Sequence, residues 1–219
     1  MLFPVLPERT GTGKSGRREN QLRKGTPAGS PEQKRKGEEL IMSVKKELDN
    51  FFERFIEAYI KTQDGLPKCP RRKDVDQAVF VGEPSDSGWC KWKPILCGQD
   101  ENFLEFLETY GIDKNMDIVD YFSSYHFLGL DIKYNKKLIA IHAVDPRDDY
   151  QKLKRVIGSY TCQDGKIPYL PLGTDQVTGL HIVVEVKTGI IKIANYETLK
   201  MRKIAPSLEE FIKGWEPVV

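Results

Sequence analysis

The chain of 219 residues is 39% hydrophobic and 10% aromatic, which suits one domain with an appendage or at most two small domains. It contains no run close to the roughly 20 apolar residues of a membrane-spanning helix, so any membrane contact is expected to be peripheral. Residues 1–41 carry nine lysines and arginines against five acids, and the remainder carries 25 against 27. The slightly acidic remainder lacks the basic face that is typical of a nucleic-acid binder.

Residues 1–41 differ in composition from the rest of the chain. Pro4 and Pro7 interrupt the short apolar start before a secretory signal develops. The following stretch is rich in Gly, Ser, Pro, Lys and Arg, so it buries too little surface to offset chain entropy and is predicted to be disordered. Lys36-Gly37-Glu38-Glu39 back-translates readily to a purine-rich ribosome-binding sequence, which favours an upstream extension before a true start at Met42. The alternative is a basic tail that touches acidic lipids or RNA.

From Ser43 onward, apolar residues recur at helical spacing and predict a helix over about 44–62, with Ser43 at its N-cap and Asp64-Gly65 as its stop. Five residues form its apolar stripe: Val44, Leu48, Phe51, Phe55 and Tyr59. The next segments are predicted to be two strands, then two helices, then two further strands. They are strands at 78–82 and 89–96, helices at 101–110 and 116–121, and strands near 132 and at 138–144.

Asp145 is predicted to cap a further helix, with Pro146 in its first turn and Asp148 at the third position, where negative charge favours the helix dipole. Its predicted buried stripe is Tyr150, Leu153, Val156, Ile157 and Tyr160. A hairpin over 180–187 and 190–194 follows, and Ser207 with Glu210 forms a capping box for the last helix. The pattern predicts a single α+β domain over 42–219, a mostly antiparallel sheet flanked by helices.

No catalytic or cofactor motif stands out in the sequence. Gly11-Thr12-Gly13-Lys14-Ser15 imitates the end of a phosphate-binding loop, but it lacks the full spacing and a preceding strand. The three histidines and four cysteines have no neighbours at metal-ligand spacing, so they are interpreted as packed histidines and reduced thiols: His126, His142, His181, Cys69, Cys90, Cys97 and Cys162. We therefore expect no enzyme activity, cofactor, metal or small-molecule substrate.

Several landmarks occur in one order along the chain: Trp92-Lys93-Pro94, Tyr125 to Gly129, Asp145 to Tyr160, Lys166-Ile167-Pro168, the hairpin turning at Thr188-Gly189, and Pro217-Val218-Val219. This order resembles the Syd family, the SecY-interacting proteins of the SUKH superfamily, over roughly 43–219. The resemblance implies a small α/β binding protein without catalytic activity. It also implies an acidic concave surface that holds the basic cytosolic loops of SecY.

Acidic residues are the candidates for such a surface. Asp117 and Asp120 stand three residues apart on one side of a predicted helix, and Asp131 follows the Gly129 landmark, one step later than the family leads us to expect. Asp145 and Asp148 open the next predicted helix. These five aspartates are the predicted partner-binding residues. The glutamates at 101, 105 and 108 are interpreted as an ordinary solvated helix face.

The resemblance implies a cytoplasmic protein at the cytoplasmic face of the membrane, docking on the SecY translocon subunit and monitoring its assembly. The alternative within the same superfamily is an immunity protein that neutralises a polymorphic toxin. Both functions use the same fold and the same kind of acidic surface, so the sequence leaves the two partners open.

Overall fold

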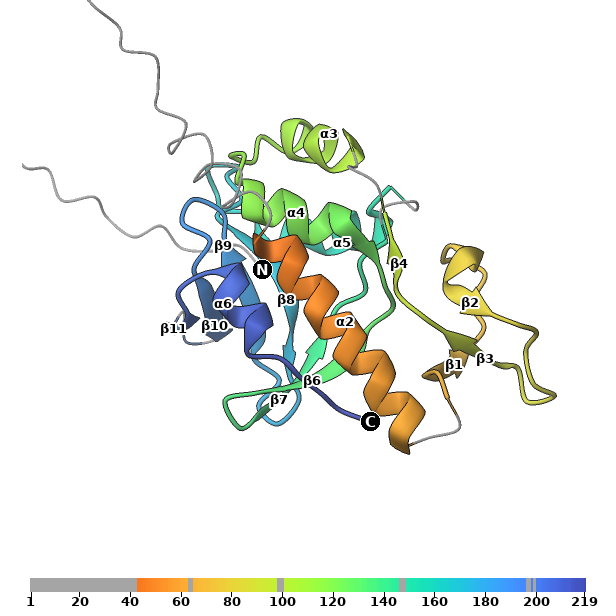
Figure 1. Ribbon diagram of the computed structural model, residues 1–219. Coiled ribbons are helices and arrows are strands. Elements are labelled where there is room, and N and C mark those ends of the chain that lie inside the picture. The colour runs from red at the N-terminus through yellow and green to blue at the C-terminus, as the bar shows by residue number, and fades with distance from the viewer. Residues whose placement is uncertain (1–42, 63–64, 98–100, 146–148, 196–197, 199) are drawn as a thin grey trace, which may run out of the picture.

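The computed structural model describes residues 43–62, 65–97, 101–145, 149–195, 198 and 200–219 (Figure 1). Predictions for residues 1–41, Pro146 and Asp148 therefore lie outside the described residues. The described helices are α2 (Ser43–Thr62), α3 (Glu101–Thr109), α4 (Met116–Ser124), α5 (Gln151–Ile157) and α6 (Leu208–Lys213), with short 3-10 turns η1 (Gln77–Val79) and η3 (Gly158–Tyr160). None of these helices is long and apolar enough to cross a membrane.

The central sheet has seven antiparallel strands in the order β11-β10-β9-β8-β7-β6-β12. The strands are β6 (Leu130–Tyr134), β7 (Lys137–Ile141), β8 (Tyr169–Asp175), β9 (His181–Glu185), β10 (Ile191–Asn195), β11 (Lys200–Ala205) and β12 (Glu216–Pro217). In β6 the buried residues Leu130, Ile132 and Tyr134 alternate with exposed Asp131 and Lys133, so one face of this strand meets the core. The α+β class with a mostly antiparallel sheet is confirmed.

Two smaller sheets accompany the main one. The first has the order β1-β3-β2, from β1 (Lys68–Pro70), β2 (Phe80–Val81) and β3 (Trp89–Trp92), and the second pairs β4 (Ile95–Leu96) with β5 (Tyr125–His126). The single strand predicted over 89–96 is thus divided between two sheets. Pro94 lies at the division, where a residue without an N–H interrupts the hydrogen-bond ladder. The four cysteines are free thiols, and Cys69 lies opposite Cys90 in the β1–β3 register.

The predicted first helix is confirmed as α2, which packs against α6, α4 and β12 and crosses in front of the sheet in Figure 1. Val44, Leu48 and Phe51 are fully buried, as their spacing predicted. Trp215, also fully buried, meets the Phe51 ring edge-on at a centroid distance of 5.1 Å. Trp215, which lies between α6 and β12, therefore packs this part of the chain against α2.

Strand β8 was missed by the sequence pattern although it lies in the middle of the sheet. Pro171 and Gly173 make the segment look like a loop, but the β8–β9 register shifts between them and the proline is accommodated at this bulge. A side chain at Gly173 would place its Cβ only 2.4 Å from the backbone oxygen of Ala140. The glycine is therefore required by the close approach of β7. The edge strand β11 was also missed, because its lysines and arginine hide the strand pattern.

The helix predicted from Asp145 begins later than expected. Helix α5 starts at Gln151, and Tyr150 precedes it in a left-handed conformation with φ of 54°. Asp145 is therefore not its cap, and the prediction was wrong. Leu153 and Ile157 are buried as predicted, whereas Val156 is 40% exposed, contrary to the predicted stripe. Tyr150 and Tyr160 are buried as predicted, so Val156 is the one member of the predicted stripe that is exposed.

The last two predicted local features are present. The β9–β10 hairpin turns at Thr188-Gly189, where Gly189 has φ of 70° and the amide of Glu185 donates to the carbonyl of Ile190. The Ser207 hydroxyl accepts a hydrogen bond from the amide of Glu210 at the start of α6. The predicted turn at Thr188-Gly189 and the predicted cap at Ser207 are therefore confirmed, unlike the cap predicted at Asp145.

Candidate functional site

Helix α4 carries the two central residues of the predicted binding surface. The Asn115 side chain caps its first turn by accepting from the amide of Asp117 at 3.1 Å. Ile118 and Val119 are buried, while Asp117 and Asp120 are only partly buried. Because positions three apart share a helix face, both carboxylates lie on one side of α4.

Helix α2 contributes a third carboxylate, which shares Lys45 with Asp120. Lys45 of α2 interacts electrostatically with Asp120 and forms an ion pair of 2.8 Å with Asp49. The hydroxyl of Tyr125, on β5, donates to Asp49 at 2.6 Å. We call Asp49, Asp117 and Asp120 the acidic cluster. The sequence pattern missed Asp49, because nothing local signals that α2 and α4 pack together.

The surroundings of Asp117 and Asp120 favour the neutral form of each carboxyl. Burial raises the pKa of Asp117. Burial, together with repulsion from Asp117, raises the pKa of Asp120 to about 6, and Lys45 only partly opposes that rise. At neutral pH Asp120 is mainly ionised, yet both carboxyls are less well solvated than free ones. A cation brought next to them would be favoured.

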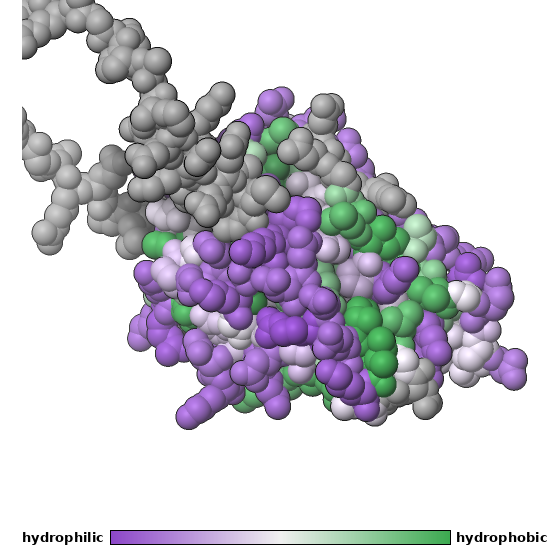
Figure 2. Space-filling view, viewed as in Figure 1, coloured by the Kyte–Doolittle hydropathy of each residue, from purple (hydrophilic) through white to green (hydrophobic). Residues whose placement is uncertain are grey.

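Exposed apolar side chains border the acidic cluster. Leu96 is 55% exposed and lies opposite Tyr125 in the β4–β5 register, and Met116, next to Asp117, is 41% exposed. Figure 2 shows mostly hydrophilic residues over α2, with an apolar strip between α2 and the three-stranded sheet. Apolar side chains bordered by polar groups match the general arrangement of a protein–protein interface, which has an apolar centre and a polar rim.

Asp131 does not join this cluster. It lies exposed on β6, where it accepts a hydrogen bond from the side chain of Gln176 and contributes to a raised pKa of Tyr59. Tyr59 follows Lys45 by 14 residues in α2, a distance of roughly 21 Å at the rise of an α-helix. Asp131 and the acidic cluster are therefore near opposite ends of α2, and the structure does not bring the three predicted aspartates together.

Asp145 is a core residue and is not available at the surface. It is 5% exposed, and its Oδ1 lies 3.3 Å from Nε2 of the fully buried His126. Asp76 faces the other ring nitrogen of His126 at 3.7 Å. His126 is thus packed between two carboxylates, as the sequence led us to expect of a core histidine. Asp145 holds this internal arrangement, and its predicted place on a docking surface was wrong. Asp148 lies outside the described residues.

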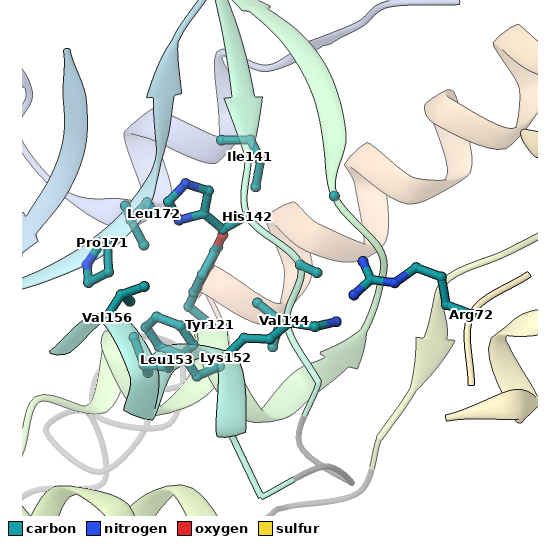
Figure 3. A pocket seen from close by; sticks show the side chains of 13 residues that line it. Arg72, Tyr121, Ile141, His142, Val144, Lys152, Leu153, Val156, Pro171 and Leu172 are labelled. Atoms are coloured by element: carbon teal, nitrogen blue, oxygen red, sulfur yellow. The ribbon is translucent and has the colours of Figure 1, made fainter. Parts of the chain in front are cut away.

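A cavity of about 410 Å³ lies between α4, α5 and the adjoining ends of β7 and β8. None of the predicted aspartates lines it; its charged lining residues are Arg72 and Lys152. Figure 3 shows these two side chains extending towards each other across the cavity. Within the described part of the chain, no group of three or more His, Cys, Asp or Glu is arranged to hold a metal ion. The hollow surface found here is therefore basic and apolar, unlike the acidic concavity that the resemblance implied.

Comparison with curated proteins finds no match to this chain. Comparison with protein families matches residues 45–217 to the family described as Syd protein (SUKH-2). The match begins in α2 and ends in β12, so it covers nearly all of the described residues, including both small sheets. The chain belongs to the Syd family.

Proposed function

We propose that the protein is a non-catalytic binding protein that docks, through the acidic cluster, on the SecY translocon subunit at the cytoplasmic face of the membrane. In this proposal the protein is cytoplasmic and peripheral, and it monitors translocon assembly. Membership of the Syd family supports a Syd-like binding function. The choice of SecY and of its basic cytosolic loops is our inference.

The observation that carries the proposal is the raised pKa of Asp120. Two neighbouring, partly desolvated carboxylates repel each other, and within the cluster Lys45 is shared with Asp49. A lysine or arginine from a partner loop would relieve this repulsion and form charge-assisted hydrogen bonds. Such pairs increase the association rate and the specificity more than the affinity. Exposed Leu96 and Met116 would supply the apolar contacts.

The test uses the full chain and SecY incorporated into lipid nanodiscs. Empty nanodiscs of the same lipids separate SecY binding from binding to lipid. A SecY variant whose cytosolic-loop lysines and arginines are replaced by glutamine tests the charge requirement. We expect binding to SecY nanodiscs alone. Equal binding to empty nanodiscs, or undiminished binding to the neutralised SecY, would contradict the proposal.

A second candidate function is toxin neutralisation, and the observation that favours it is the SUKH-2 description of the matched family. A basic surface on a toxin would satisfy the acidic cluster by the same chemistry as a SecY loop. Growth rescue of cells that express a toxin encoded beside this gene separates the two partners. Rescue without measurable SecY binding would favour immunity over translocon docking.

A further inference from the structure

The cavity between α4 and α5 contains polar groups that the proposed docking does not use. The Tyr121 side chain, which lines the cavity, is 1% exposed, and its hydroxyl has no hydrogen-bond partner among the described residues. The Nζ of Lys152 is also buried there without a hydrogen-bond acceptor in the described part of the chain. The Lys152 ammonium acts electrostatically on Asp74. Without an acceptor at hydrogen-bond distance, however, it does not recover the hydrogen bonds that it lost with its hydration.

The second cation of the cavity is held at its rim. The guanidinium of Arg72 binds the Asp74 carboxylate through two nitrogens, at 2.5 and 3.0 Å. This pairing fixes Arg72 while Lys152 lies deeper, and the two cationic side chains converge in Figure 3. Asp74 neutralises Arg72, so Lys152 is the cation lining the cavity that has no hydrogen-bonded anion among the described residues. The arrangement therefore indicates a negatively charged ligand.

The walls of the cavity show what the rest of such a ligand must be. Ile141, Leu153, Val156 and Leu172 line it together with the ring of Phe122. A bare phosphate or sulfate would place charged oxygens against these apolar side chains, at a cost in solvation. At roughly 30 Å³ for each water-sized group, the volume of about 410 Å³ holds on the order of a dozen non-hydrogen atoms. A compact apolar body with one anionic end fits these walls.

We propose that this cavity binds a small organic carboxylate whose charged end is held by Lys152 and the Tyr121 hydroxyl and whose apolar body packs between α5 and the ends of β7 and β8. Lysine donates a charge-assisted hydrogen bond to one carboxylate oxygen, and the tyrosine donates to the other. Arg72 remains at the rim, paired with Asp74. This ligand site is separate from the acidic cluster and does not depend on the docking partner.

The experiment titrates the full chain with benzoate and with benzamide, its uncharged counterpart of the same shape, and measures binding by calorimetry and by shifts of assigned backbone amide resonances. We expect benzoate to bind more tightly than benzamide, with shifts confined to α4, α5 and the ends of β7 and β8. No binding of benzoate, equal binding of the two compounds, or shifts confined to other basic surfaces would overturn the proposal.

Two variants and a matched control test whether Lys152 and Tyr121 hold the carboxylate. Lys152→Met keeps the length and apolar stem of the side chain, and it should weaken benzoate binding about tenfold or more, the usual effect of losing a charged hydrogen bond. Tyr121→Phe should weaken it severalfold. Lys154→Met, on the same helix, removes a lysine that pairs with Asp149 and should leave binding unchanged. Undiminished binding by Lys152→Met would overturn the proposal. The comparison of benzoate with benzamide on the unaltered chain decides the question even if a variant fails to fold.

Discussion

Lys45 of α2 acts electrostatically on Asp120 of α4, across two helices that pack together, and lowers the pKa of a carboxyl that burial and Asp117 both raise. The same lysine forms an ion pair with Asp49. Lys45 thus stabilises the ionised form of Asp120 in part, and we expect a basic loop of a partner to stabilise it further. The acidic cluster is therefore sensitive to each cation placed beside it.

Replacing Lys45 by methionine should raise the pKa of Asp120 further above its present value of about 6, because the one opposing effect is removed. A pH titration of the Asp120 side-chain carboxyl by NMR measures this shift. Lys46→Met is the matched control, since Lys46 is exposed on the neighbouring position of α2 and has no part in the Asp120 interactions. An unchanged Asp120 titration in Lys45→Met would contradict the described pairing.

Asp120→Asn should stabilise the protein at pH 7.5. The folded-state pKa of about 6 lies above the unfolded value of 3.8, so the carboxyl destabilises the fold increasingly as pH rises from about 4 through 6. Because the group is partly solvated, we expect about 1 kcal/mol, or a rise in Tm of roughly 2–4 °C, and no gain below about pH 4. Thermal unfolding at both pH values measures it, with exposed Asp86→Asn as the control. A gain of equal size at both pH values would exclude this cause.

Charge reversal of Asp117 and Asp120 in the acidic cluster should strongly weaken binding to a basic partner. Asp117→Lys combined with Asp120→Lys replaces two attractive charges by two repulsive ones, and we expect SecY-nanodisc binding to fall about tenfold or more. Binding by the unaltered chain should weaken as salt rises from low to physiological concentration, because exposed ion pairs are screened.

The matched control for charge reversal is Glu105→Lys combined with Glu108→Lys, an equal charge change on two exposed residues of α3. Circular dichroism establishes that both double variants are folded. If the α3 variant loses as much affinity as the α4 variant, the effect reflects net charge rather than the acidic cluster. If binding is independent of salt, an apolar interface is the better explanation.

Leu153→Ala should cost about 2–5 kcal/mol of unfolding free energy, because Leu153 is 8% exposed and packs inside the domain. Val156→Ala on the same helix should cost well under half as much, since Val156 is 40% exposed. Chemical denaturation of both variants measures the difference. Equal costs would mean that α5 is turned differently on the sheet.

Deletion of residues 1–41 should leave the melting temperature unchanged, because a segment of that composition is expected to bury almost no apolar surface. Differential scanning calorimetry of the full and shortened chains makes the comparison. A melting temperature lower by several degrees in the shortened chain would show that the segment packs on the domain. Mass spectrometry of the native N-terminus determines separately whether the protein begins at Met42.

The sequence by itself determined the features that depend on neighbours a few residues away. The buried stripe of α2, the turn at Thr188-Gly189 and the cap that Ser207 provides for α6 all follow from local periodicity and local hydrogen bonds. The order of such elements was sufficient for the α+β class. The same order carried the resemblance to the Syd family.

Only the tertiary structure decided how the chemistry-bearing residues are grouped. Strand β8 exists despite Pro171 because a bulge and the close approach of β7 at Gly173 accommodate it. Asp145 lies in the core beside His126. Asp131 lies near one end of α2, and Asp120 lies near the other. These outcomes depend on contacts between segments that are far apart in the chain. The energies of such contacts come from burial and charge in the folded protein, and they produce no periodic pattern in the sequence.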